Sequence, residues 1–413
     1  MRIVSGREAG VVVERLAARG LRLRGLEPRV RRILDGVRGV GDRSLRRYAE
    51  QWDGLGAKQP LRVSEEEMAS AWRMLAPLLR KSLRQAARNI RNFCEWQKPK
   101  NWMRTRGGVA LGQLVRPLES VGCYVPGGRY PLVSTLLMTV IPAQVAGIKN
   151  IRVVSPRPST QVLGAAAMLG VCELFRIGGA QAVAALAYGT TSIPRVDKIV
   201  GPGNAYVTVA KKLVSFDCAI DFLAGPTEAV VLSESGVPEF IAADLVAQSE
   251  HDPEALAVLI TTSRRLARSV SLNVARCAKG NSTAMESLRR RGAILVAPSR
   301  EQAREWANRL APEHITVAKE DLPFIQNAGS IFVGDYSAQA AGDYASGPNH
   351  VLPTSGQARF RGGLSVVDFV KVITVQELSA QGLRRIAPAI ECLANAEGLP
   401  AHAQSIGVRC EHA

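Results

Sequence analysis

Hydrophobic positions recur at helical spacing through the first hundred residues of the chain. This spacing predicts amphipathic helices near residues 8–19, 28–51 and 65–97. A glycine-rich break at Gly54-Leu55-Gly56 separates the last two helices. We therefore expect residues 1–100 to form a helical N-terminal region. The Gly107-Gly108 pair that follows predicts the turn of a β-hairpin.

From residue 121 the pattern changes to short β-rich runs separated by helical stretches of small residues. The runs predict strands at 121–125, 151–155, 174–177, 198–200 and 229–233. The stretches between them predict helices at 131–147, 159–170, 180–188 and 204–214. Alternation of strands and helices at this spacing is typical of βαβ units and a parallel sheet.

A second series of the same kind follows, and it predicts a second α/β unit. Its helices are expected at 238–250, within 264–291 and at 300–310. Its strands are expected at 256–262, 293–297, 315–318 and 330–334. The Gly/Pro-rich residues 342–363 are too long for an ordinary connection and indicate a functional loop. A last helical segment is predicted at 376–397.

Length and composition agree with this α/β prediction. At 413 residues, the chain is long enough for at least two domains, and 46% of its residues are hydrophobic. No apolar run approaches the roughly 20 residues of a membrane-spanning helix, so we expect no membrane partner. Seven scattered cysteines without a C-x-x-C pair, and an N-terminus without a signal-peptide pattern, favour a cytoplasmic protein.

The net charge of +17 is concentrated at the N-terminal end. Residues 1–120 carry 26 Lys and Arg against 12 Asp and Glu, whereas the rest of the chain carries 27 against 24. A basic face is able to bind nucleic acid. However, the chain has no zinc-finger pattern, no RNP-like motif and no aromatic residues interleaved with the basic ones. We therefore predict no nucleic-acid partner.

Histidine is scarce, and its positions indicate chemistry. Four of the five histidines lie close to a carboxylate or a carboxamide in the sequence, namely His251, His314, His350 and His402. His412 lies in the C-terminal tail. Because imidazole titrates near neutral pH and is the commonest metal ligand, these neighbours predict a metal or proton-transfer site. The alternative for each histidine is a purely structural role.

Gln248 and His251 stand three residues apart at the end of a predicted helix that Pro253 prevents from continuing. This spacing places both side chains on one helical face, as a metal clip requires. An imidazole nitrogen with a carboxamide oxygen suits a borderline cation such as Zn²⁺. Asp343 and His402 are candidates to complete the set.

Glu313 and His314 precede a predicted strand. Adjacent residues on an extended chain point in opposite directions, so we expect the two side chains to have separate roles. The imidazole would act as a general base, and the carboxylate would handle a water molecule or orient a partner. A cap at the beginning of the strand with a surface glutamate is equally compatible with the local sequence.

Three glycine turns follow predicted strands of the first series, near Tyr124, Gln181 and Asn204. Glycines there let backbone amides approach a ligand at the carboxyl edge of a parallel sheet, where such folds bind nucleotides. None of the turns is G-x-G-x-x-G, and there is no P-loop motif. The three turns together predict a crevice of nucleotide size.

Taken together, these residues make the chain resemble the histidinol dehydrogenase family of zinc- and NAD-dependent enzymes, from about residue 20 to 408. The matching segments are 121–128, Arg176-Ile-Gly-Gly-Ala-Gln181, Gly201-Pro-Gly-Asn204, Gly225-Pro-Thr-Glu228, Gln248-Ser-Glu-His251, Pro312-Glu-His314, 341–353 and Glu397-Gly-Leu-Pro-Ala-His402.

The resemblance implies one Zn²⁺ per subunit, with the ligands Gln248, His251, Asp343 and His402. Members are intertwined homodimers, so His402 would come from the partner subunit. The resemblance also implies that Glu313 and His314 are the catalytic acid and base. Besides His314 and the zinc ligands, Thr227 and Glu397 would contact the substrate.

The resemblance further implies that NAD contacts Tyr124, Gln181 and Asn204. The implied reaction is the four-electron oxidation of L-histidinol through L-histidinal to L-histidine, the last steps of histidine biosynthesis. His314 would accept a proton in each of the two oxidations, and Glu313 would activate the water that hydrates the aldehyde. Thr227 occupies a position that is usually Ser in the family, and it keeps the hydroxyl.

The implied fold consists of two incomplete Rossmann-like parallel-sheet domains in an intertwined homodimer. Residues 121–225 would form the NAD-side domain, and residues 226–365 would carry the catalytic pair and the metal ligands. The helical region 1–100 is expected to pack with this second domain. Residues 101–120 would form a hairpin connector, and residues 366–413 would be the segment exchanged between the subunits.

Two other enzyme classes remain open at this point. A family relative that oxidises another polyol or a sulfonated diol would use the same Glu–His pair, and Arg129 beside the first glycine turn would favour an anionic substrate. A zinc hydrolase would use Glu313 to activate a metal-bound water. That class leaves the three glycine turns without a role. The role of His350, substrate contact or support of its loop, is also open.

Overall fold

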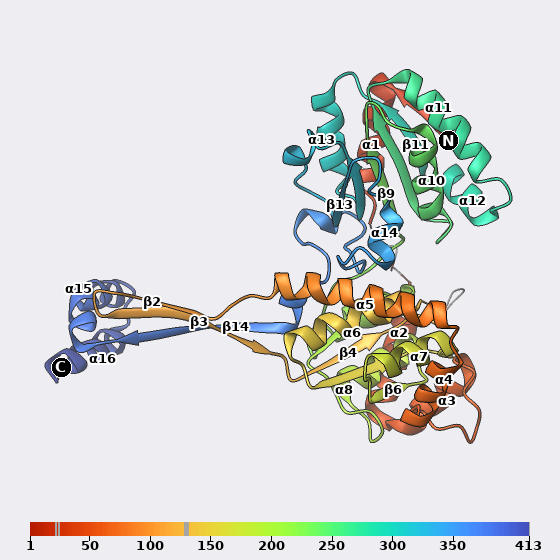
Figure 1. Ribbon diagram of the computed structural model, residues 1–413. Helices are drawn as coiled ribbons and strands as arrows, with labels where there is room; N and C mark the ends of the chain where they lie inside the picture. The colour runs from red at the N-terminus through yellow and green to blue at the C-terminus, as the bar shows by residue number, and fades with distance from the viewer. Residues whose placement is uncertain (21–22, 24, 128–131, 413) are drawn as a thin grey trace.

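The computed structural model describes residues 1–20, 23, 25–127 and 132–412. It has two lobes, each built on a parallel sheet, and a long arm that extends away from one of them (Figure 1). The arm carries a small antiparallel sheet. The predicted α/β class with parallel sheets is therefore confirmed. Arg129 lies outside the described residues.

The first lobe contains a five-stranded parallel sheet in the order β6-β5-β4-β7-β8. Its strands are β4 (Ser120–Tyr124), β5 (Asn150–Val154), β6 (Glu173–Phe175), β7 (Lys198–Val200) and the short β8 (Ala219–Ile220). The connecting helices are α6 (Val133–Ala146), α7 (Thr160–Met168), α8 (Gly179–Tyr188) and α9 (Ala205–Val214). The central strand β4 is buried along its whole length.

Most N-terminal helices pack on the first lobe, not on the second as expected. They are α2 (Glu27–Val40), α3 (Asp42–Trp52), α4 (Glu65–Met74) and α5 (Pro77–Gln97). Helix α2 packs against α8 and α9, α4 against α7, and α5 against α6. Val30 and Val37 of α2 are fully buried in the same core as α8, so burial of the apolar helix faces decides the location.

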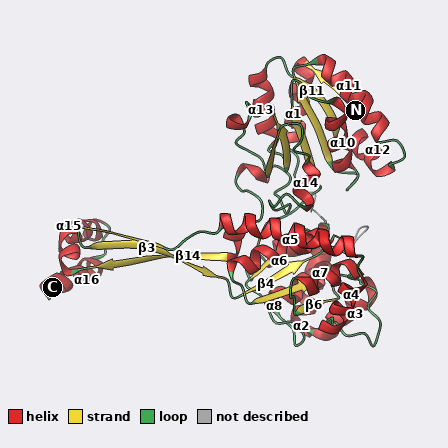
Figure 2. Cartoon of the chain, in the orientation of Figure 1, coloured by secondary structure: helices red, strands yellow, loops and turns green. Residues whose placement is uncertain are grey.

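The second lobe contains a six-stranded parallel sheet in the order β1-β11-β10-β9-β12-β13. Its strands are β1 (Arg2–Ser5), β9 (Glu228–Leu232), β10 (Leu256–Thr261), β11 (Gly292–Val296), β12 (His314–Val317) and β13 (Ser330–Val333). The helices are α1 (Gly6–Ala17), α10 (Pro238–Ser249), α11 (Arg264–Cys277), α12 (Ser282–Arg291) and α13 (Arg300–Leu310). Helices surround the strands of each lobe (Figure 2). Of the N-terminal region, only the first 17 or so residues belong to this lobe, as strand β1 and helix α1. The edge strand β1 was not predicted.

The arm is built from segments that are far apart in the sequence. Strands β2 (Trp102–Arg106), β3 (Val109–Pro117) and β14 (Val370–Leu378) form its antiparallel sheet, with β3 in the centre. Helices α15 (Ala380–Ala396) and α16 (Pro400–Glu411) lie at its far end (Figure 1). The hairpin turn at Gly107-Gly108 is confirmed, and both glycines have positive φ.

The predicted helix 376–397 begins four residues late, because residues 376–378 continue β14 and pair with β3. Helix α16 was not predicted. The Gly/Pro-rich residues 342–363 begin in the short helix α14 (Gln339–Tyr344), which lies near the junction of the lobes (Figure 1). Among the described residues, no helix combines the length and the hydropathy needed to cross a membrane.

Candidate active site

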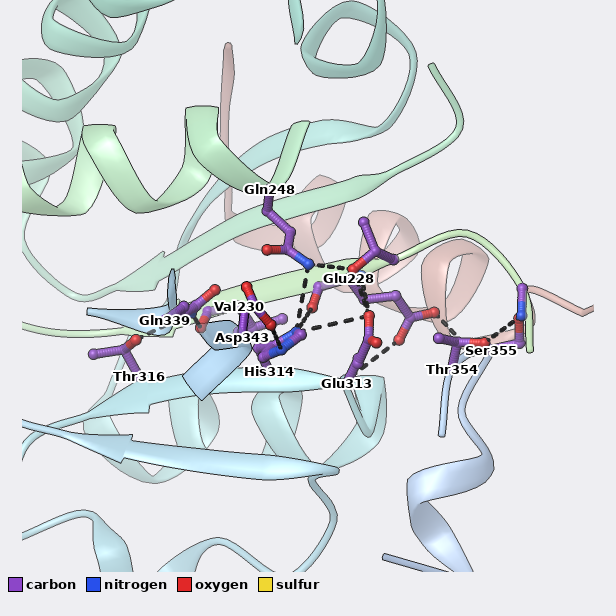
Figure 3. Close-up of polar contacts among 12 residues, drawn as sticks. Glu228, Val230, Gln248, Glu313, His314, Thr316, Gln339, Asp343, Thr354 and Ser355 are labelled. Atoms are coloured by element: carbon purple, nitrogen blue, oxygen red, sulfur yellow. Dashed lines mark hydrogen bonds and ion pairs between the residues drawn. The ribbon is translucent and has the colours of Figure 1, made fainter. Parts of the chain in front are cut away.

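The catalytic candidates lie at the amino ends of two neighbouring strands of the second sheet. His314 is the first residue of β12 and pairs in register with Ala229 of β9. Thr227 directly precedes β9, and Glu313 lies in a bend directly before β12. Parallel pairing of β9 with β12 therefore brings residues almost 90 positions apart into one cluster (Figure 3).

The Glu313 carboxylate is the centre of this cluster. Its Oε2 atom accepts a hydrogen bond from Thr227 Oγ1 at 2.5 Å and another from the backbone N–H of Glu228 at 2.9 Å. The same oxygen lies 3.7 Å from His314 Nδ1. The expectation that the two side chains point apart is wrong, because Glu313 sits in a bend and not on the extended strand.

Burial and charge perturb both groups. Burial raises the pKa of the Glu313 carboxyl to about 7, against the charge of His314 and the hydrogen bonds that it accepts. Burial alone would lower the pKa of His314, but the carboxylates of Glu313 and Asp343 outweigh it and raise the pKa to about 9. Both pKa values are raised, and the two groups lie 3.7 Å apart, an arrangement suited to proton transfer.

Three of the four expected metal ligands line one cavity with Glu313 and His314. The cavity has a volume of about 200 Å³, and Gln248, His251 and Asp343 all face it. Gln248 is the last residue but one of α10, His251 follows two residues after the helix, and Asp343 lies on α14. Asp343 Oδ1 lies 3.4 Å from His314 Nε2. Thr135 of α6 also lines the cavity, so both lobes contribute to it.

The donor atoms in this cavity fit a borderline cation. The Gln248 amide nitrogen donates to Thr227 Oγ1, which orients the amide oxygen away from Thr227 and leaves it for a ligand (Figure 3). Burial acts to raise the pKa of Asp343, but the His314 side chain outweighs it, so the net direction is down. One imidazole with two oxygens suits Zn²⁺. In the described part of the chain, no three His, Cys, Asp or Glu side chains form a group that could hold a metal ion.

His350 lines the same cavity and also supports its wall. Its Nδ1 atom lies 2.8 Å from the backbone carbonyl of Asp343, and its Nε2 atom lies 3.4 Å from Thr135 Oγ1. Burial lowers the pKa of the imidazole, so the ring is held neutral. The contact to Asp343 indicates that His350 orients the loop that carries the expected metal ligand.

A second, larger cavity of about 730 Å³ lies in the first lobe. The expected cofactor residues Tyr124, Gln181 and Asn204 all line it. Tyr124 Oη accepts a hydrogen bond from the backbone N–H of Gly179, at the beginning of α8. Asn204 caps the beginning of α9 through its side-chain oxygen. The three glycine turns therefore meet at one edge of the sheet, as predicted.

Comparison with known proteins identifies the family of this chain. The sequence profile of the histidinol dehydrogenase family matches residues 18–410. The chain belongs to the histidinol dehydrogenase family. It is 48% identical over 389 residues to the histidinol dehydrogenase of Methanothermobacter thermautotrophicus, covering 90% of this chain and 91% of that protein. The Methanosarcina barkeri protein of the same name is 44% identical, with 96% and 95% covered.

A solved structure agrees with the fold of this family member. The crystal structure of histidinol dehydrogenase from Elizabethkingia anophelis superposes with a TM-score of 0.95 at 35% identity. The match covers the whole of this chain and 98% of the other. The two lobes and the arm are therefore arranged as in an experimentally determined member of the family.

Two residues expected in the site of a histidinol dehydrogenase are absent from this cavity. Glu397 caps the end of α15 and His402 lies on α16, both at the far end of the arm (Figure 1). Their side chains are exposed. Within one chain, therefore, the arm does not bring them to Gln248, His251 and Asp343.

Residues of the N-terminal helical region, which were not predicted, also line the cavity of the first lobe. Asp53, directly after α3, accepts hydrogen bonds at 3.0 Å from Gln181 Nε2 and from the backbone N–H of Gly178. Burial raises the pKa of this carboxyl, against both hydrogen bonds. Tyr48 and Trp52 stack in parallel beside it, with ring centroids 4.8 Å apart. No local motif marks Asp53, because its partners lie more than 100 positions away.

Proposed function

We propose that this chain oxidises L-histidinol through L-histidinal to L-histidine, with two NAD molecules reduced for each histidinol. The observation that carries this proposal is the Glu313–His314 pair in one cavity with Gln248, His251 and Asp343, in a chain of the histidinol dehydrogenase family. The reaction removes two hydrides, and each removal needs a group that accepts a proton. The site offers such a group in His314.

His314 would act as the general base in both oxidations. Its Nδ1 atom lies 3.2 Å from the backbone carbonyl of Glu228, an acceptor that fixes the proton on Nδ1 and leaves Nε2 free. Nε2 faces Asp343 across the cavity. Glu313 and then Asp343 raise the pKa of His314, and a cation held by Asp343 would offset the part of that effect that comes from Asp343.

Glu313 would serve the step between the two oxidations, in which the aldehyde is hydrated. A carboxyl with a pKa of about 7 both accepts and releases a proton near neutral pH. The hydrogen bond from Thr227 fixes its orientation. The second carboxylate oxygen is then available to a water molecule beside the substrate.

Zinc would be held by Gln248, His251 and Asp343, with His402 of the partner subunit as the fourth ligand. When bound, one zinc ion per subunit would hold the imidazole and the amine of the substrate in place. NAD would occupy the cavity of the first lobe, against Tyr124, Gln181 and Asn204. Hydride chemistry would then be carried by the cofactor, with the protein supplying orientation and proton transfer.

The proposed assembly is an intertwined homodimer of Rossmann-like domains, with the arm exchanged between subunits. The arm exposes large apolar side chains, as expected for a surface that a second copy covers. They include Trp102, Met103, Leu111, Val372, Ile373, Leu393 and Val408. The same exchange would bring Glu397 and His402 to the partner's cavity.

The free cysteines agree with a reducing compartment such as the cytoplasm.

The test is NADH formation by the purified protein with L-histidinol, before and after removal of zinc by a chelator. We expect about two NADH per histidinol, loss of turnover on chelation, and recovery with zinc. No turnover by a folded, zinc-loaded protein would contradict the proposal. Turnover of another polyol or a sulfonated diol in its place would assign the chain to a relative with a different substrate.

A further inference from the structure

Glu228 carries a buried charge that the proposed chemistry does not use. Its side chain is 3% exposed, and it forms a two-point ion pair with Arg19, which follows α1. Arg19 Nε lies 2.6 Å from Glu228 Oε1, and Arg19 Nη2 lies 2.5 Å from Glu228 Oε2. Burial of an unpaired carboxylate costs free energy. Arg19, more than 200 positions away in the sequence, supplies the partner of Glu228.

Every polar group of Glu228 is connected to the catalytic pair or to the wall of its cavity (Figure 3). The backbone N–H donates to Glu313 Oε2, and the backbone carbonyl faces His314 Nδ1. Oε2 of the side chain accepts the backbone N–H of Glu313 at 3.3 Å. Oε1 accepts the backbone N–H of Ser355 at 2.8 Å. Ser355 follows Thr354, which lines the substrate cavity.

Backbone strain is concentrated at the same place. Only three non-glycine residues in the described ranges have positive φ, and two of them, Ala311 and Ser355, contact this ion pair. Arg19 Nη2 reaches the carbonyl of Ala311 at 3.5 Å, and Ser355 is held by Glu228. Such conformations persist only where the surrounding contacts hold them. Because Ala311 lies two residues before Glu313, its backbone conformation affects the direction of the chain at Glu313 and His314.

We propose that Arg19 and Glu228 are positioning residues that set the orientation of Glu313 and His314. Glu228 holds the backbone of Glu313, Arg19 holds the Glu228 carboxylate by two contacts, and the pair contacts the strained residues on either side. The inference rests on the roles proposed above for Glu313 and His314. It adds to the site two residues that are not among the proposed metal ligands, substrate contacts or NAD contacts.

The structure also offers a way to restore the interaction chemically. Arg19, Glu228 and Ser355 line a third cavity of about 390 Å³, which Asp252 and Arg291 also line and which adjoins the cavity of the first lobe at Asn204. In an Arg19→Ala variant this cavity would extend to the Glu228 carboxylate. A guanidinium ion from solution then has room to enter and to reproduce the two-point contact.

The experiment compares Arg19→Ala with wild type in steady-state kinetics. We expect kcat to fall about 10- to 100-fold, with the KM values for histidinol and NAD and the zinc content within about twofold. Millimolar guanidinium should recover a substantial part of kcat, and methylammonium at the same concentration should not. Arg19→Lys should be intermediate, because one ammonium cannot make both contacts.

Arg309→Ala is the matched control, because Arg309 forms a similar but exposed pair with Glu14 of α1. It should keep the wild-type kcat and show no response to guanidinium. If Arg19→Ala does not fold, Glu228→Gln takes its place, since the amide keeps an acceptor for Ser355 but lacks the charge; its kcat should fall with unchanged zinc content.

A folded Arg19→Ala with wild-type kcat would overturn the inference, and so would a loss that guanidinium does not restore or that Arg309→Ala shares. For Glu228→Gln, a wild-type kcat or loss of zinc would overturn it. Failure of the proposed function is distinguishable, because wild type itself would then not oxidise histidinol.

Discussion

At the scale of single residues, one hydroxyl connects the two halves of the proposed chemistry. Thr227 Oγ1 donates to Glu313 and accepts from the Gln248 amide, so it orients the proposed catalytic carboxylate and a proposed metal ligand together. A hydroxyl is suited to this position because it donates and accepts at once.

Replacing Thr227 by Val should therefore lower kcat by about 10- to 100-fold, since a hydrogen bond to a charged group contributes about 1.5–3 kcal/mol. Thr227→Ser is the control and should stay within about twofold of wild type, because it keeps the hydroxyl. Steady-state kinetics with L-histidinol measures both. Equal activity of the Val and Ser variants would show that the hydroxyl does not orient Glu313.

At the residue scale, the structure also shows which predicted site residues lie together. Glu313, His314, Gln248, His251 and Asp343 were all predicted, and the structure brings them to one cavity. The relative orientation of Glu313 and His314 was wrong, because the bend before β12 is not visible in the local pattern. Arg19, Asp53 and Glu228 were not assigned roles, since each acts through a partner far away in the sequence.

At the scale of elements, helix ends and strand ends hold the two cavities. The end of α10 and the short α14 present expected metal ligands, and the amino end of β12 presents the proposed catalytic pair beside the amino end of β9. The cofactor cavity depends on the beginning of α8. There Asp53 connects α3 to the backbone N–H of Gly178 and to the Gln181 amide.

Asp53→Leu should raise the KM for NAD about tenfold, because two lost hydrogen bonds of about 0.7 kcal/mol each correspond to that factor. The KM for histidinol should stay near wild type, since the substrate cavity does not include Asp53. Asp53→Asn keeps an acceptor oxygen and serves as the control. An unchanged KM for NAD in the Leu variant would remove Asp53 from the cofactor site.

At the scale of the whole molecule, the arm indicates how two subunits would assemble. It extends from the first lobe and carries Glu397 and His402 on exposed positions, away from the cavity of its own chain (Figure 1). An arm with exposed apolar residues and two predicted site residues fits exchange with a second copy. The cavity would then be complete only in the dimer.

Complementation between two inactive variants tests this arrangement. A heterodimer of His314→Ala and His402→Ala subunits, purified with two different tags, should regain roughly half of the wild-type activity, because one of its two sites is intact. Each variant alone should be nearly inactive, and the two homodimers are the controls. An inactive heterodimer would show that His402 serves the site of its own chain.

The sequence by itself determined the local and chemical features of this protein. Period and composition predicted most helices and strands, and the spacing of scarce histidines with polar neighbours predicted which residues carry the chemistry. These features depend on neighbours within a few positions, so they are readable along the chain. Only the tertiary structure decided which lobe buries helices α2 to α5, where β1 pairs, and how Arg19, Glu228 and Asp53 support the two cavities. Those outcomes depend on burial and on hydrogen bonds between residues more than 100 positions apart, which no local pattern records.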